Sequence, residues 1–235
     1  MGNSAVMKIQ KALLEKGFFP GIIDGIWGRR TIAAVKAFQS SQGLVADGIV
    51  GPRTCARLFG ETAPLAPGIM LPWMAEAESL MGTKEVAGPR GSNPKILDWA
   101  DNLDIHYPGD DIPWCGLFVG HCVASALPAE VLPANPLGAR QWGAFGEPTQ
   151  PRRGAIMVFW RESRTSGKGH VGFYTGETAN AYRILGGNQS NQVSQALISK
   201  ERFLKARWPV SAASLGGGEA IVFVDQEEAL EEQLA

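Results

Sequence analysis

An eight-residue motif occurs twice near the start of the chain, and this repeat constrains the fold more than any other feature. DGIWGRRT spans residues 24–31, and DGIVGPRT spans residues 47–54, 23 residues later. Each copy opens with an Asp-Gly turn and ends with a threonine that can start or support a helix. The spacing of apolar residues predicts helices before, between and after the two turns. Residues 1–60 are therefore predicted to form a small three-helix bundle.

The rest of the chain has room for a second domain, since 235 residues exceed one average domain. The three prolines of GETAPLAPGIMLP predict a semi-rigid linker over residues 61–72. A helical pattern resumes at Trp73, so we expect a second domain over residues 73–210 and an extension over 211–235. The extension contains a candidate strand, Ala220–Val224, and an acidic end that we expect to be a solvated helix or disordered.

Charge and hydropathy exclude several classes of partner. The formal net charge is -1, so the chain has no broad electrostatic attraction to nucleic acid. No apolar stretch is long enough to cross a bilayer, and the first residues do not form a signal-peptide pattern. The three cysteines are widely spaced and odd in number, which argues against a disulfide framework. We therefore expect a monomer made and kept in a reducing cytoplasm, with no membrane or nucleic-acid partner.

A cysteine at the start of a predicted helix is the candidate nucleophile. In WCGLFVGHCVASAL, residues 114–127, the apolar stripe of the helix contains Cys115 and Cys122. Cys115 lies in the first turn, where unpaired N–H groups and the helix dipole should favour the thiolate and could hold an oxyanion. Cys122 lies two turns further on, beyond both effects, and is predicted to be a core residue.

The general base follows by elimination among three histidines. His121 is six residues beyond Cys115 on the same helix, about 9 Å along the axis and about 120° around it, too far to reach the thiol. His106 lies in the preceding loop, which has no rigid frame. His170 stands in GKGHVGFYTGE, an alternating segment that predicts a strand paired with residues 154–160. His170 is the best candidate base.

A third predicted strand, residues 181–187, ends just before two amide side chains. An amide oxygen there could accept a hydrogen bond from the second ring nitrogen of His170 and fix its tautomer. Asn188 is the first choice for this role and Gln189 the second. Trp114 and Gln189 are also candidates for substrate contact.

Both copies of DGxxGxxT, together with AVKAFQ at residues 34–39, resemble the peptidoglycan-binding domain found at one end of many wall hydrolases. The resemblance implies bacterial peptidoglycan as the partner, without indicating which side chains contact it. For the aspartates and glycines, turn formation is the favoured interpretation over direct ligand contact. Trp27 is similarly interpreted as a packing residue, and Cys55 as a small buried hydrophobic residue.

Three later motifs, PWCGLFV, GHVGFY and GGNQS in that order, resemble the NlpC-like and CHAP branches of the papain-like cell-wall cysteine hydrolases. The upstream PWMAEAESLMGTKEVAG and SNPKIL resemble the lead-in of one phage and bacterial subfamily. The resemblance implies Cys115 as nucleophile, His170 as base and Asn188 as the polar orienting residue. One departure is that many CHAP domains carry a glutamate shortly before the asparagine, where this chain has Gly186 and Gly187.

The expected fold class is therefore α+β, with a small three-helix bundle tethered to a papain-like domain of helices packed on an antiparallel sheet. The expected function is cleavage of a peptidoglycan stem-peptide amide through a thioester acyl-enzyme, either as an endopeptidase or as an N-acetylmuramoyl-L-alanine amidase. No metal or organic cofactor is needed. A wall target without a signal peptide fits an endolysin that waits in the host cytoplasm until a holin opens the membrane.

Cys115 could instead be a buried structural residue and His170 a histidine whose hydrogen bonds are simply satisfied, which is the default interpretation for either residue alone. Three further alternatives remain open. A zinc site could use His106, His121 and the two nearby cysteines, although no metal-binding spacing such as C-x-x-C is present. A non-catalytic wall adaptor, such as a phage tail or spore component, would bind without cutting. A cysteine peptidase acting on proteins is the third, and the wall-binding repeat argues against it.

Overall fold

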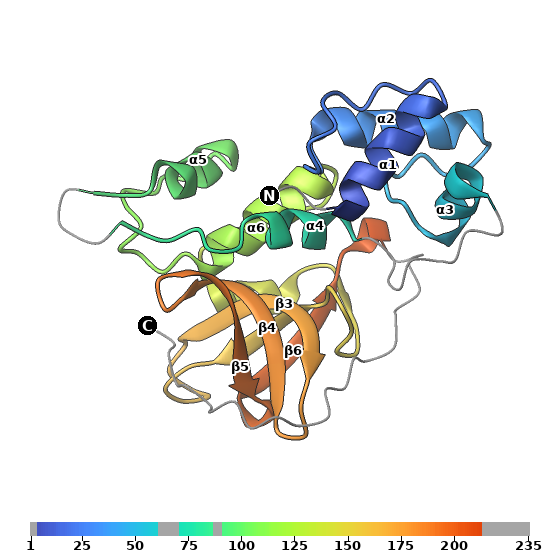
Figure 1. The fold of residues 1–235 in the computed structure, drawn as a ribbon. Coiled ribbons are helices and arrows are strands. Elements are labelled where there is room, and N and C mark those ends of the chain that lie inside the picture. The colour runs from blue at the N-terminus through green and yellow to red at the C-terminus, as the bar shows by residue number, and fades with distance from the viewer. Residues whose placement is uncertain (1–3, 61–70, 87–90, 213–235) are drawn as a thin grey trace.

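The structure is a computed structural model that describes residues 4–60, 71–86 and 91–212 (Figure 1). The predicted linker at residues 61–72 lies almost wholly outside the described residues. The candidate strand Ala220–Val224 and the acidic end also lie outside them. Within the described ranges, no helix combines the length and the apolar character needed to cross a membrane.

Residues 4–60, which we call the N-terminal module, contain three helices around a small apolar core. The helices are α1 (Ser4–Glu15), α2 (Arg29–Ser41) and α3 (Pro52–Phe59). Trp27 is buried in this core beside Leu13 and Phe38, which agrees with its interpretation as a packing residue. Cys55 is partly buried against the same core. The three helices predicted from the repeat are therefore present.

A buried glutamine organises the first copy of the repeat. Gln10, on α1, donates from its side-chain nitrogen to Asp24 Oδ1 (3.0 Å), Ile26 O (3.1 Å) and Thr31 Oγ1 (3.2 Å). The backbone N–H of Gly25 donates to the Gln10 oxygen at 2.9 Å. The positions that the two copies of the motif share thus converge on one amide group, and their shared role is structural.

Gln39, on α2, plays the same part in the second copy. Its side-chain nitrogen donates to Asp47 Oδ1 (2.8 Å), Ile49 O (2.8 Å) and Thr54 Oγ1 (3.2 Å). The backbone N–H of Gly48 donates to its oxygen at 2.8 Å. The two glutamines are 29 residues apart, whereas the motifs are 23 residues apart. Gln10 and Gln39 therefore do not occupy equivalent positions when the two copies are aligned.

Replacing Gln39 by alanine should destabilise the N-terminal module by about 3 kcal/mol, because several buried polar groups would lose their partner at once. Native-state hydrogen exchange of the α1–α3 amides in the full chain measures this, as a fall in protection of about 150-fold. The exposed Gln42, also near the end of α2, supplies the control, since Gln42→Ala should change stability by less than about 0.5 kcal/mol. Unchanged protection in Gln39→Ala would contradict a structural role for the network.

The second part of the chain begins with three helices and continues into one antiparallel sheet. The helices are α4 (Pro72–Ser79), α5 (Pro94–Asn102) and α6 (Cys115–Ala126), followed by short 3-10 turns at η1 (Ala139–Ala144), η2 (Lys200–Arg202) and η3 (Val210–Ala212). The strands are β1 (Glu147–Pro148), β2 (Ile156–Trp160), β3 (Gly169–Glu177), β4 (Ala181–Gln189), β5 (Gln192–Ser199) and β6 (Phe203–Trp208).

The sheet has the order β1-β6-β2-β3-β4-β5 within the described residues, and every neighbouring pair is antiparallel. Helix α6 packs against the two strands β3 and β4, as Figure 1 shows. Phe118 of α6 and Phe173 of β3 have ring centroids 6.0 Å apart in this layer. The predicted α+β class, with helices packed on an antiparallel sheet, is confirmed.

The strands agree only in part with the sequence patterns. The predicted strands at residues 154–160 and 167–177 are present as β2 and β3. The third predicted strand is longer than expected, since β4 continues to Gln189. β5 and β6 were not predicted. Ser190 and Asn191, both with positive φ, form the tight turn between β4 and β5, and a Ser-Asn pair is a weaker hairpin signal than Asn-Gly.

The N-terminal module packs directly against the second part. Ile49, from the second repeat, is buried within the main core of the second part, and Ala75 of α4 is buried in the core of the module. Figure 1 shows α1–α3 on the opposite side of α4 and α6 from the sheet. Ile26, which occupies the same place as Ile49 in the first repeat, is 49% exposed, so only the second copy is used for this contact.

Candidate active site

Cys115 is the first residue of α6, as the sequence pattern predicts. The helix start is held close to the loop before η1, because a Cβ at Gly116 would lie 2.1 Å from Pro136 O and 2.9 Å from Leu137 O. Only glycine fits at this position. The thiol is 4% exposed, so the first turn of α6 is enclosed by its surroundings.

The environment of the thiol differs from expectation in one respect. The helix start was expected to make Cys115 ionise more readily, but burial raises the pKa of the thiol above its ordinary value. The backbone N–H groups of Val171 and Gly116 and the charge of Arg161 lower the pKa and offset only part of this increase. The resting thiol is therefore neutral at pH 7, with its sulfur next to the backbone of the residue that follows His170.

His170 lies on β3 opposite Phe159 of β2 and is 2% exposed. Its Nε2 is 3.0 Å from Gln189 Oε1. Burial lowers the pKa of His170 to about 4, although the bond to Gln189 raises it, and the charges of Arg161 and Arg202 lower it further. The imidazole is therefore neutral at pH 7. Because an amide oxygen can only accept, Nε2 carries the ring proton and Nδ1 has the free lone pair.

Gln189 is itself fixed in orientation. Its side-chain nitrogen donates to Ile184 O at 3.3 Å and to Ser194 O at 2.5 Å. These two bonds occupy the donor end of the amide, so the oxygen must face the His170 ring. The side chain is 1% exposed, which shields the arrangement from water.

The structure thus places Gln189, the second choice, against the ring rather than Asn188. Asn188 has φ +53, and its side-chain oxygen is buried without a hydrogen-bond partner among the described residues. The pairing of β4 with β5 shifts register between Gly186 and Gln189. This irregularity breaks the alternation of side chains and turns the residue after Asn188 toward His170. A catalytic role for Asn188 stays a prediction.

Gly186 and Gly187 have a steric explanation in this structure. A Cβ at Gly186 would lie 3.1 Å from His170 Nε2 and 2.9 Å from Gln189 Oε1. A Cβ at Gly187 would lie 2.6 Å from Phe118 Cβ and 2.8 Å from the ring of Trp114. The absence of side chains at both positions lets β4 approach the imidazole and the start of α6.

Trp114, a candidate for substrate contact, is fully buried. Its Nε1 donates to Glu85 Oε2 at 3.2 Å, and its ring lies 6.1 Å from that of Trp99. In this arrangement Trp114 forms part of the core beneath the start of α6. Its contact with substrate stays a prediction.

The two remaining histidines and Cys122 lie away from the Cys115–His170 region. His121 Nε2 is 3.1 Å from Glu76 Oε1, and its ring stacks on Trp99 with centroids 5.2 Å apart, which ties α6 to α4 and α5. His106 is exposed in the preceding loop. Cys122 is fully buried in the core, as predicted. Among the described residues, no group of three or more His, Cys, Asp or Glu side chains could hold a metal ion.

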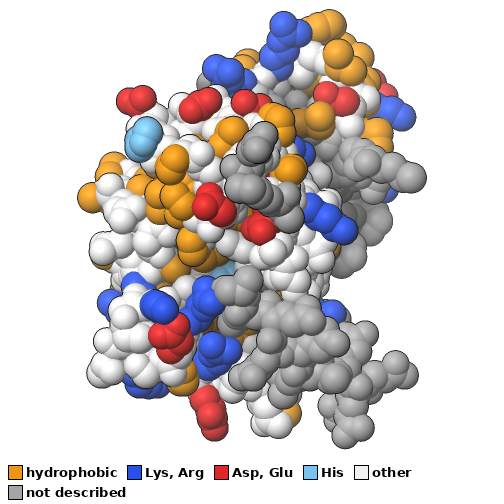
Figure 2. All heavy atoms as spheres, turned by 90° about the vertical axis from the view of Figure 1, so that its left-hand side faces the viewer, with side chains coloured by type: hydrophobic (Ala, Val, Ile, Leu, Met, Phe, Trp, Pro, Cys, Tyr) orange, Lys and Arg blue, Asp and Glu red, His pale blue; other side chains and the backbone are white. Residues whose placement is uncertain are grey.

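Charge on the surface is mixed. Figure 2 shows Lys and Arg side chains together with Asp and Glu side chains over one face, and neither sign covers it. This agrees with the net charge of -1. This face therefore carries no broad electrostatic field of one sign.

Comparison with known proteins identifies the N-terminal part. Residues 2–58 match the family described as "Putative peptidoglycan binding domain". The chain is 44% identical over 65 residues to a "Probable N-acetylmuramoyl-L-alanine amidase" of Bacillus licheniformis, covering 25% of this chain and 18% of the relative. It is 33% identical over 92 residues to "N-acetylmuramoyl-L-alanine amidase CwlM" of Mycobacterium tuberculosis, covering 39% and 21%.

These similarities fall in the region of the binding domain. The chain spans about a fifth of the length of these curated relatives. No solved structure is significantly similar to the chain.

Proposed function

We propose that this chain is a cysteine-dependent peptidoglycan hydrolase that binds the wall through its N-terminal module and cleaves an amide bond with Cys115 and His170. The observation that carries the proposal is the meeting of α6 and β3. The Cys115 thiol lies at the backbone N–H of Val171. In the adjacent residue, His170, the ring nitrogen Nε2 is hydrogen-bonded to Gln189. The match of residues 2–58 to a peptidoglycan-binding family and the amidase names of the relatives support a wall substrate.

The catalytic domain, proposed to span residues 73–210, has a papain-like arrangement. The proposed nucleophile is at the start of α6, the proposed base is on β3, which packs against that helix, and the base donates to an amide oxygen from β4. The order of these three parts along the chain supports the resemblance to NlpC-like and CHAP hydrolases. The proposed linker rests on its three prolines, and the proposed boundaries of the catalytic domain rest on the same resemblance.

In the proposed mechanism the thiol and the imidazole are both neutral before the reaction. Nδ1 of His170 takes the thiol proton as sulfur attacks the carbonyl carbon of the amide. The backbone N–H groups at the start of α6 stabilise the developing oxyanion. The C–N bond then breaks, the imidazolium returns its proton to the leaving amine, and a thioester remains. Water, deprotonated by His170, hydrolyses the thioester and restores the thiol.

A non-catalytic wall adaptor is the competing function, and the burial of both reactive groups favours it. Cys115 is 4% exposed and His170 is 2% exposed, so a substrate has little access to them in this conformation. Labelling of the amino termini released from purified sacculi separates the two functions. New L-alanine termini indicate an amidase, and new diaminopimelate termini indicate an endopeptidase. Binding to sacculi with no new termini would contradict the hydrolase proposal.

The proposal predicts an unusual pH profile. Because burial favours the neutral imidazole, His170 should remain a competent base until the pH falls to about 4, below its ordinary pKa of 6.5. The acidic limb of kcat/KM, which reports the free enzyme, should therefore lie near pH 4. The measurement uses a soluble wall fragment, with circular dichroism at each pH to detect unfolding. An acidic limb near pH 6.5 with an intact fold would contradict the buried, neutral base.

A further inference from the structure

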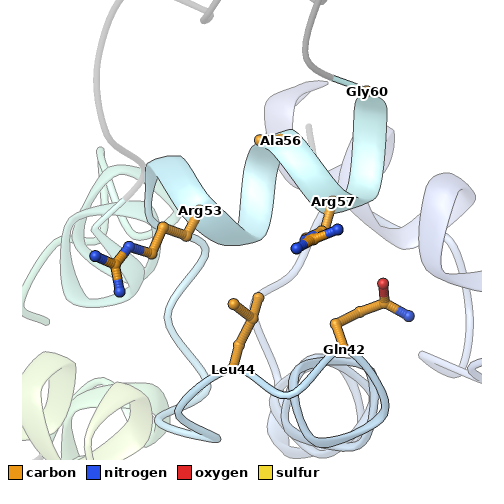
Figure 3. Close-up of a pocket in the computed structure, with 6 residues that line it drawn as sticks. All are labelled: Gln42, Leu44, Arg53, Ala56, Arg57 and Gly60. Atoms are coloured by element: carbon orange, nitrogen blue, oxygen red, sulfur yellow. The ribbon is translucent and has the colours of Figure 1, made fainter.

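A pocket of about 510 Å³ lies on the N-terminal module, between α3 and the end of α2 (Figure 3). Figure 3 shows Arg57 on α3 opposite Leu44 and Gln42, while Arg53, nearer the start of the same helix, extends to the left past Leu44 and away from Gln42. The lining is completed by Ala56 and Gly60. The pocket thus combines two guanidinium groups with one amide and one apolar side chain.

The two arginines carry positive charge that the described residues do not neutralise. Neither Arg53 nor Arg57 forms an ion pair with any described residue, and no acidic side chain is among those that line the pocket. Both side chains are exposed. The N-terminal module is itself basic, with eight Lys and Arg residues against three Asp and Glu residues over residues 4–60, so the pocket lies on the basic part of a chain whose net charge is -1.

The first copy of the repeat shows that this site is not required for folding. With the 23-residue offset, Arg53 corresponds to Arg30, whereas Arg57 corresponds to Ala34. Leu44 corresponds to Gly21, and the Arg30 side chain lies against that glycine, with its Cδ 3.0 Å from where a Cβ would be. The first copy therefore forms the same turn and helix without a second arginine. The stability of the motif therefore does not explain why the second copy carries two arginines.

We propose that this pocket binds a carboxylate of the peptidoglycan stem peptide, an inference that rests on the proposed wall-binding role of the module. A guanidinium group binds a carboxylate through two parallel hydrogen bonds, and two such groups around one pocket favour an anionic ligand. Leu44 offers an apolar contact for an alanine methyl group, and the Gln42 amide can pair with a peptide group. Stem peptides present these chemical groups close together.

The test uses the full chain with Cys115→Ala, so that binding is measured without cutting. Sacculi are purified and freed of phosphate-containing polymers, and binding is measured by co-sedimentation. Arg53→Ala and Arg57→Ala should each weaken binding about tenfold, the value for one charge-assisted hydrogen bond. Arg30→Ala is the matched control, because it removes the same charge from the same repeat position outside the pocket, and it should bind like the parent.

A second arm changes the wall instead of the protein. Converting the sacculus carboxylates to amides should weaken binding of the parent about tenfold or more and remove the difference between the parent and Arg57→Ala. Thermal unfolding measurements check that each variant is folded. If Arg57→Ala does not fold, Arg57→Gln replaces it.

The outcomes separate this inference from the proposed function. If the parent binds amidated and native sacculi equally, or if the arginine variants bind like Arg30→Ala, the carboxylate pocket is wrong while wall binding stands. If dependence on Arg53 and Arg57 appears only on walls that retain phosphate polymers, the ligand is a phosphate and the inference is overturned. If the parent binds no sacculi, wall binding itself fails and the inference fails with it.

Discussion

Replacing Cys115 by serine should lower the rate of amide cleavage in sacculi by about 10⁴-fold or more, the scale seen when the nucleophile of a catalytic triad is removed. A serine hydroxyl is far less acidic than a thiol. The base available to activate it is weak, since burial lowers the pKa of His170 to about 4. The rate at which new amino termini appear measures the loss. Binding of the variant to sacculi should be unchanged, because the N-terminal module is intact.

Cys122→Ser is the matched control on the same helix. Cys122 is fully buried in the core of the second part, two turns from the start of α6. Burying a hydroxyl there should cost about 1–3 kcal/mol of stability. Activity below the melting temperature should nevertheless stay close to that of the parent. Full activity in Cys115→Ser would contradict the thiol mechanism.

Replacing Gln189 by alanine should lower the rate by about 10²-fold, less than the loss of about 10⁴-fold that follows loss of a buried triad carboxylate. Gln189 Oε1 holds the proton of His170 on Nε2, so its removal lets the ring sample the wrong tautomer and rotamer. The nitrogen chemical shifts of the imidazole should show a mixture of tautomers in Gln189→Ala. Fold and wall binding should be retained, which makes Gln189 a positioning residue.

Asn188→Ala is the comparison that decides between the two amides. Its side-chain oxygen has no hydrogen-bond partner in the part of the chain that the structure describes, so the variant should lose little activity and keep the parent's imidazole shifts. A large loss in Asn188→Ala with little change in Gln189→Ala would return the orienting role to Asn188.

Local patterns were sufficient to predict which elements carry the two candidate reactive residues. An apolar stripe defines α6 and places Cys115 at its start, and strict alternation defines β3 around His170. Both patterns depend on residues within one element. The orienting amide depends instead on the irregular pairing of β4 between Gly186 and Gln189, where Asn188 adopts a left-handed backbone conformation. Gly186, Gly187 and Asn188 are residue types that tolerate a bulge, but they do not fix which side chain the bulge turns toward His170, so alternation alone gave no reason to prefer Gln189.

Properties that depend on packing between distant segments could not be predicted from the sequence. The raised pKa of Cys115 follows from burial of the helix start under residues 136–137 and against β3, segments distant in sequence. The backbone N–H groups at the start of the helix do lower the pKa of the thiol, as predicted, but burial raises it by more. The glutamines that organise the two repeats were hidden for a similar reason, since Gln10 and Gln39 precede their motifs by different distances.

The most direct test of the mechanism compares loss of activity with alkylation of each cysteine by iodoacetamide, followed by peptide mass spectrometry. Cys55 is only partly buried and should react first, without loss of activity. Cys115 should react more slowly, and the rate of cleavage should fall in proportion to its modification, whereas EDTA should leave the rate unchanged. A protein that still releases new amino termini at the full rate after complete alkylation of Cys115 would contradict the account.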